Sequence, residues 1–197
     1  MSKHHRRSVR LNHYDYSQPG AYFITICTHN RRCMLGNINS EMAELFSTGN
    51  VAKKFWLEIP THFQNVELDQ FVIMPNHIHG VIKIYDHKPV GVQYIEPLQY
   101  IEPLQENKYQ HIIPKSIGSI IRSYKSAVTR WCSKNNHQNF QWQRNYYEHI
   151  IRNENELNRI REYIQNNPLK WELDRENPES KNFNLDHDLY WKEIYGQ

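Results

Sequence analysis

One stretch of the sequence, residues 71 to 84, constrains the fold more than any other, because two histidines interrupt an otherwise apolar run. It reads FVIMPNHIHGVIKI. Side chains alternate between the two faces of a β-strand, so His77 and His79 share one face. The opposite face carries an apolar row that suits packing against helices: Ile78, Gly80, Ile82 and Ile84. The pattern therefore predicts a strand over residues 77–85, with a core side and a side available for chemistry.

The two histidines are candidate metal ligands. Neutral imidazole is a common ligand of divalent metals, and an i, i+2 pair on a strand projects two nitrogens into one small volume. Two ligands do not make a metal site, however, and an isolated His-x-His is more often a pair of ordinary sheet residues. A functional interpretation needs support from other segments of the chain.

Length, charge and cysteine content narrow the class of protein. A chain of 197 residues suits one domain with a sizeable core. The sequence has no apolar run long enough for a membrane span, and its basic N-terminus lacks the apolar segment of a secretory signal. Three cysteines without CxxC spacing suit a reducing compartment, and a net charge of +3 permits nucleic-acid binding. We therefore expect a cytoplasmic, nucleoid-associated protein without membrane partners.

Hydrophobic patterns elsewhere predict three more strands and three helices. The strands cover residues 21–28, 66–74 and 140–151, and the helices cover the second half of 40–59, then 116–134 and 154–167. The last helix begins after Asn153, a plausible N-cap, with Glu156 at the capping-box position. This order predicts an α+β fold: a ferredoxin-like (RRM-like) antiparallel four-stranded sheet with two crossover helices and an additional C-terminal helix.

The domain boundaries follow from changes in composition. Residues 1–14 form a basic arm, which either contacts phosphates or is a solvated terminus. A single domain then spans residues 15–172. It contains a loop insertion at about 86–114, in which the hexapeptide YIEPLQ occurs twice in succession. Residues 173–197 are polar, and we interpret them as a C-terminal docking tail.

The last helix supplies the second half of a possible site. Leu157, Ile160 and Ile164 make its buried stripe, and Tyr163 and Asn167 lie beside one another on its flank. If the crossover helices cover the apolar face of the sheet, this helix can approach the face that bears the histidines. A metal held by two histidines and an amide oxygen, with a phenol close by, is a chemically coherent arrangement for phosphodiester cleavage.

Four segments resemble a known family, the single-tyrosine HUH nucleases, and most closely its REP-associated tyrosine transposases. They are MPNHIHG (74–80), GSIIRSYKS (118–126), WQRNYYEHIIR (142–152) and YIQNNP (163–168). The resemblance implies that His77, His79 and Asn167 bind Mg²⁺ or Mn²⁺ and that Tyr163 is the nucleophile. It further implies cleavage of single-stranded DNA beside REP-like hairpins through a 5′-phosphotyrosine intermediate.

Further residues are candidates for supporting roles. Basic side chains that can contact DNA, although a solvated face is the commoner explanation for them, are Arg6, Arg7, Arg10, Arg122, Lys125, Arg144 and Arg152. Glu148 and His149 fall in a matching segment and are candidates for orienting the metal ligands.

Three other functions stay open at this point. A mobile insertion-sequence transposase would work as a homodimer that exchanges its tyrosine helix, whereas the long tail here favours a monomer. A non-catalytic nucleic-acid-binding module can also use an open four-stranded sheet. A hydrolytic metalloenzyme that uses bound water is the weakest alternative, because the sequence places no carboxylate obviously as a base.

Overall fold

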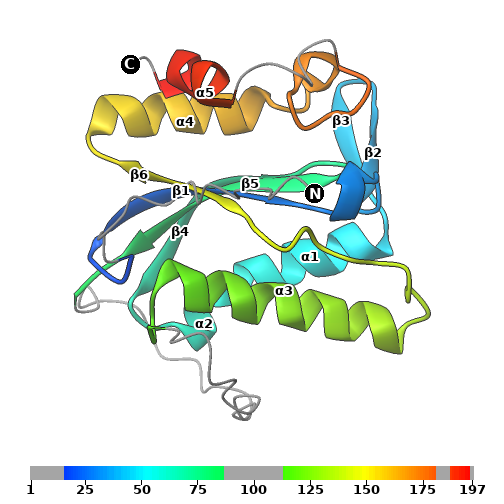
Figure 1. Cartoon of the computed structure of the whole chain (residues 1–197), viewed down its shortest axis with the longest axis horizontal. Helices are drawn as coiled ribbons and strands as arrows, with labels where there is room; N and C mark the ends of the chain where they lie inside the picture. The colour runs from blue at the N-terminus through cyan, green and yellow to red at the C-terminus, as the bar shows by residue number, and fades with distance from the viewer. Residues whose placement is uncertain (1–15, 87–112, 181–186, 196–197) are drawn as a thin grey trace, which may run out of the picture.

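A four-stranded antiparallel sheet forms the centre of the protein (Figure 1). The computed structural model describes residues 16–86, 113–180 and 187–195. The strands are β1 (Gly20–Cys27), β4 (Val66–Ile73), β5 (His77–Ile84) and β6 (Tyr147–Ile151), in the order β4-β5-β1-β6. The two inner strands are therefore β5 and β1, and the predicted ferredoxin-like sheet is confirmed.

Helices cover both faces of this sheet (Figure 1). On one face lie α1 (Ser47–Leu57), the short α2 (Ile59–His62) and α3 (Ile117–Lys134), and on the other lie α4 (Glu154–Asn166) and α5 (His187–Tyr195). Each face has its own buried apolar cluster. Among the described residues, no helix has the length and apolar character needed to cross a lipid bilayer.

The alternation in β5 determines which side chains face which layer. Ile78, Ile82 and Ile84 are buried in the cluster beneath α1 and α3, as predicted. A Cβ added at Gly80 would lie 2.4 Å from Cζ2 of Trp56, so only glycine lets this α1 indole lie against the strand. The opposite face carries the two histidines, and β1 places Cys27 opposite His77 and Thr25 opposite His79.

The extra helix α4 packs on the histidine face through the predicted stripe. Leu157, Ile160 and Ile164 are buried against Phe23 and Val81 of the sheet. Asn153 is the N-cap and accepts a hydrogen bond from the backbone N–H of Glu156 at 2.9 Å, as the sequence predicted. This cap fixes where the helix begins, and hence which of its residues reach the histidines.

A β-hairpin after the first strand was not predicted. It consists of β2 (Gly36–Asn39) and β3 (Met42–Leu45), and it follows the short 3₁₀ turn η1 (His29–Arg31). Its turn residues Ser40 and Glu41 have φ of 47° and 65°, a conformation that glycine and asparagine normally signal in a sequence. Because Ser-Glu gives no such signal, the sequence does not predict this hairpin.

The fourth strand is shorter than predicted, and the segment predicted as a docking tail contains a further 3₁₀ turn and a helix. Strand β6 begins at Tyr147, because residues 140–146 make only an isolated bridge from Trp142 to Thr28. A second 3₁₀ turn, η2 (Trp171–Leu173), opens a segment whose Asp174, Glu176 and Asn177 are buried. The N-terminal arm and the duplicated hexapeptide lie outside the described residues.

Candidate metal and nucleophile site

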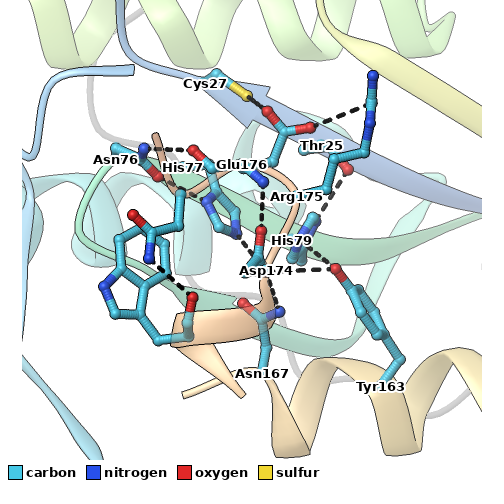
Figure 2. Close-up of polar contacts among 12 residues, drawn as sticks. Thr25, Cys27, Asn76, His77, His79, Tyr163, Asn167, Asp174, Arg175 and Glu176 are labelled. Atoms are coloured by element: carbon cyan, nitrogen blue, oxygen red, sulfur yellow. Dashed lines mark hydrogen bonds and ion pairs between the residues drawn. The ribbon is translucent and has the colours of Figure 1, made fainter. Parts of the chain in front are cut away.

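The two histidines of β5 lie together on the face of the sheet that α4 and the segment after it cover (Figure 2). Both side chains are completely buried. Their ring centroids are 4.3 Å apart, and the planes of the rings are inclined at 60°. The strand therefore presents two imidazoles to one small volume, as predicted from their i, i+2 spacing.

The contact with Asn76 assigns the tautomer of His77. The Asn76 amide nitrogen donates to the carbonyl oxygens of Arg31 and Glu176, at 3.0 and 2.8 Å. Its amide oxygen therefore faces His77 and accepts from Nδ1–H at 2.8 Å. This tautomer leaves a lone pair on Nε2, which is buried without a hydrogen-bond partner among the described residues.

His79 is held by strand β1 on one side and by the tyrosine helix on the other. Its Nδ1 lies 2.9 Å from Oγ1 of Thr25, and its Nε2 lies 3.2 Å from the hydroxyl of Tyr163. Burial lowers the pKa of His79 well below its ordinary value, and the neighbouring His77 lowers this pKa further. His79 is thus a neutral imidazole at neutral pH, the form that binds metals.

Tyr163 points from α4 toward the histidines, as the sequence predicted (Figure 2). Besides His79, its hydroxyl contacts Tyr190 of α5 at 3.3 Å and Oδ2 of Asp174 at 3.5 Å. Burial raises the pKa of Tyr163 well above its usual value, and the charge of Asp174 raises this pKa further. The phenol is therefore protonated at neutral pH and needs a proton acceptor before it can act as a nucleophile.

An ion-pair network fixes α4 on the sheet close to Tyr163. Arg161 donates two hydrogen bonds to Asp69 of β4, at 2.8 and 2.7 Å, and Lys83 of β5 contacts the same carboxylate at 2.7 Å. This bidentate geometry restrains the rotation of the helix as well as its distance from the sheet. Tyr163 is therefore carried on a rigid element.

Asn167 and Asp174 complete the site. Asn167 lies at the C-cap of α4, and its amide nitrogen donates to Oδ2 of Asp174, whereas its Oδ1 is buried without a partner among the described residues. The same Asp174 oxygen lies 3.9 Å from Nε2 of His77. One ligand atom each from His77, His79 and Asp174 lies within 4.8 Å of the others, so these residues can hold a metal ion.

Glu176 holds this carboxylate-bearing segment in place. Its backbone N–H donates to Oδ1 of Asp174 at 2.6 Å, and its Oε2 accepts from Nε of Arg31 at 2.6 Å and from the thiol of Cys27 at 3.2 Å. Burial acts to raise the pKa of Glu176, but the charge of Arg31 and its hydrogen bond outweigh burial, so this pKa is lowered. Glu176 therefore remains charged and links the strand, the loop and Asp174.

The sequence interpretation missed Asp174 and Glu176. The polar segment after α4 contains four acidic residues, and only the structure separates the two buried ones from the two exposed ones: Glu172, Asp174, Glu176 and Glu179. No periodic pattern marks them, because the segment is irregular. A hydrolytic metalloenzyme was the weakest alternative because the sequence placed no carboxylate as a base. Asp174 is a carboxylate within the site, so this objection no longer holds.

The two candidates for orienting the ligands lie away from the histidines. Glu148 pairs with Ile24 in the sheet and is buried on the face that α1 and α3 cover. His149 is on the histidine face, but its Nε2 contacts Glu156 at 2.7 Å and its ring stacks on Tyr195 with centroids 3.8 Å apart. Asn76 and Thr25 make the contacts to the histidines instead.

The basic candidates do not gather at the site. Lys125 donates to the backbone carbonyls of Gln143 and Arg144, at 2.5 and 3.2 Å, and so braces the loop before β6. Arg122, Arg144 and Arg152 are exposed, and Arg122 belongs to α3 on the far side of the sheet. Three further candidates lie outside the described residues: Arg6, Arg7 and Arg10.

Comparison with known proteins supports the fold. No family model matches the chain. An uncharacterized protein of Haemophilus influenzae is 46% identical over 172 residues, which cover 87% of this chain and 93% of that protein. A solved REP-associated tyrosine transposase bound to a REP hairpin has a TM-score of 0.53 at 21% identity, over 82% of this chain and 74% of that one. A putative transposase from Deinococcus radiodurans has a TM-score of 0.42 at 18% identity, over 80% and 95%.

Proposed function

We propose that this chain, which belongs to the same family as the Haemophilus influenzae protein, is a metal-dependent nuclease and strand transferase for single-stranded DNA. It would act beside REP-type hairpins through a covalent 5′-phosphotyrosine. The observation that carries the proposal is the position of the Tyr163 hydroxyl. It lies 3.2 Å from Nε2 of His79, beside a cluster of buried side chains that can bind a metal. The fold shared with a transposase that was solved on a REP hairpin supports the choice of substrate.

The residues present fit a divalent metal. Nε2 of His77 and Oδ1 of Asn167 are buried polar atoms without hydrogen-bond partners among the described residues, which is costly unless a ligand occupies the space between them. We propose His77, His79 and Asp174 as ligands of Mg²⁺ or Mn²⁺, with the amide oxygen of Asn167 as a further donor. When bound, the metal would neutralise charge on the phosphodiester and polarise its P–O bond.

The tyrosine performs the covalent step. The oxygen of Tyr163 attacks phosphorus, the bond from phosphorus to the 3′-oxygen breaks, and the 5′ phosphate of the downstream strand stays on the phenol. The oxygen of Asp174 that lies 3.5 Å from the hydroxyl is already assigned to the metal, so the phenolic proton passes to water, and the departing 3′-oxygen takes up a proton from water to become a hydroxyl. Because the new ester retains the energy of the old one, attack by another 3′-hydroxyl reverses the step and transfers the strand.

A gel assay tests the proposal. Hairpin-bearing single-stranded DNA incubated with the protein and Mn²⁺ should give an adduct that survives denaturation, and both EDTA and Tyr163→Phe should abolish it. Tyr190→Phe is the matched control, because the hydroxyl of Tyr190 lies 3.3 Å from the hydroxyl of Tyr163 but is not the proposed nucleophile. An adduct that persists in Tyr163→Phe, or no adduct with any hairpin, contradicts the proposal.

The same assay separates the alternatives. A hydrolytic metalloenzyme would cut DNA without an adduct and would survive Tyr163→Phe. A non-catalytic binding module is disfavoured because α4 and α5 cover the sheet face that such modules use for bases (Figure 1). Sedimentation tests the dimer that exchanges tyrosine helices: a stable dimer would favour it, and a monomer would favour a chain whose Tyr163 serves its own histidines.

A further inference from the structure

An open hollow of about 320 Å³, called the cavity below, lies beside the β2–β3 hairpin and is lined in part by exposed residues. The residues that line it include the polar Asn37, Asn39 and Glu44 of the hairpin, together with Pro75 and Trp171. This volume is at the lower end of the range for small-ligand pockets and suits one planar ring system. The chemistry of the site described above does not use the cavity.

Two residues connect this cavity directly to the metal site. Pro75 lies two positions before His77, and the ring of Trp171 lies 6.1 Å from the ring of His77, inclined at 29°. The hairpin is fixed to the same turn, since the N–H of Leu35 donates to the carbonyl of Pro75 at 2.8 Å. The position of the cavity relative to the two histidines is therefore fixed.

We infer that the cavity binds one unpaired base of the strand that Tyr163 cleaves, an inference that rests on the proposed function. Trp171 and Pro75 offer ring surfaces for stacking, which binds any base through its π-face. The amides of Asn37 and Asn39 can both donate to and accept from a base edge. Glu44 would repel a phosphate but suits a base, so the backbone of the strand lies outside the cavity.

Glu44 also gives the cavity a preference among bases. The amide nitrogen of Asn39 donates to Oε1 of Glu44 at 3.2 Å and so orients the carboxylate. A carboxylate accepts hydrogen bonds from the exocyclic amino groups of guanine, adenine and cytosine, whereas thymine has no such group. The cavity therefore favours an amino-bearing base over thymine at one position beside the cleaved phosphate.

Cys33 provides a probe of occupancy. It lines the cavity and is exposed, whereas Cys27 and Cys132 are buried, so a thiol reagent should modify Cys33 first. The experiment uses full-length Tyr163→Phe protein with Mg²⁺, which binds DNA without cutting it. A hairpin with a single-stranded flank on the strand to be cleaved should slow the alkylation of Cys33 about tenfold when about nine tenths of the protein is bound. Two control DNAs, compared at the same occupancy, should leave the alkylation rate unchanged. One is a blunt hairpin, and the other has a flank in which an abasic nucleotide replaces the base proposed to enter the cavity.

Binding measurements complete the test. Trp171→Ala should weaken binding of the flanked hairpin by about 5- to 150-fold, the range for loss of one base stack, and leave the blunt hairpin unaffected. Met42→Ala, on an exposed hairpin position outside the cavity, is the matched control and should change neither affinity. Asn37→Ala, also exposed, gives a second variant that does not depend on the packing of the indole.

The two possible failures are distinguishable. If fluorescence anisotropy shows bound DNA while Cys33 reacts at the free rate for every flank, the inference is overturned and the proposed function stands. If no hairpin binds at all, both fail. A thymine flank that protects as well as guanine would overturn the assignment of Glu44 to base recognition.

Discussion

Replacing Asn76 with alanine tests how the site keeps His77 ready to bind a metal. The substitution removes an acceptor from Nδ1–H of His77 and a donor from the carbonyl oxygens of Arg31 and Glu176. Each buried group that loses its partner costs about 1–3 kcal/mol, and carbonyl oxygens tolerate the loss better than N–H groups. We expect a loss of about 2–4 kcal/mol in the free energy of unfolding, measured in urea with EDTA present.

Metal affinity should fall as well, since the imidazole is no longer held in one tautomer. Loss of such an orienting contact typically weakens metal binding about 10- to 100-fold, which calorimetric titration with Mn²⁺ measures. Asn76→Asp is the matched control: it keeps an acceptor for Nδ1–H but loses the two donated bonds. Its stability should fall at least as far as that of the alanine variant, because a buried carboxylate oxygen then faces the two carbonyl oxygens, while its affinity for Mn²⁺ falls less. Wild-type affinity in Asn76→Ala would refute the reasoning.

Two further predictions concern the packing that supports the site. Gly80→Ala places a Cβ 2.4 Å from the Trp56 indole, so the free energy of unfolding should drop by about 1–3 kcal/mol in urea denaturation, and an unchanged midpoint would contradict the close approach. Hydrogen bonds from Arg161 lower the pKa of Asp69 well below its ordinary value. This carboxylate therefore stabilises the fold fully above its unfolded-state pKa of about 4. The stabilisation is lost as the pH falls through the folded-state pKa. The stability difference between wild type and Asp69→Asn should therefore be about 1–2 kcal/mol at pH 7 and shrink below pH 4; a difference that stays constant with pH would contradict the assigned ion pair.

The regular elements could be predicted from the sequence because each buries one face. In β5 the alternation of apolar residues with histidines gave the strand and its orientation, and in α4 the stripe of Leu157, Ile160 and Ile164 gave the helix and its packing face. The β2–β3 hairpin could not be predicted, since Ser40 and Glu41 adopt positive φ without glycine. The start of β6 was misplaced because the residues before Tyr147 alternate in sequence without a partner strand over most of that length.

The candidate site likewise contains residues that the sequence predicts and residues that it does not. Periodicity places His77 and His79 on one strand face and Tyr163 and Asn167 on one helix flank, and the resemblance to tyrosine transposases joined the two pairs. Their proximity agrees with the structure, whereas their catalytic roles stay a prediction. Asp174 could not be found this way, because in an irregular segment no period tells which side chains turn inward.

The buried acids argue that the segment after α4 belongs to the site and is more than a docking tail. A carboxylate loses hydration when it is buried, and this cost is recovered only through charged or hydrogen-bonded partners. For Asp174 these partners are Asn167 and the N–H of Glu176, and for Glu176 they are Arg31 and the thiol of Cys27. Cys27 lies opposite His77 in the sheet, and Arg31 lies in η1 just after β1. A chain cut at residue 172 would therefore leave the histidines without the carboxylate of Asp174 and Arg31 without the carboxylate of Glu176. The catalytic unit that the proposed function requires therefore extends at least through Glu176.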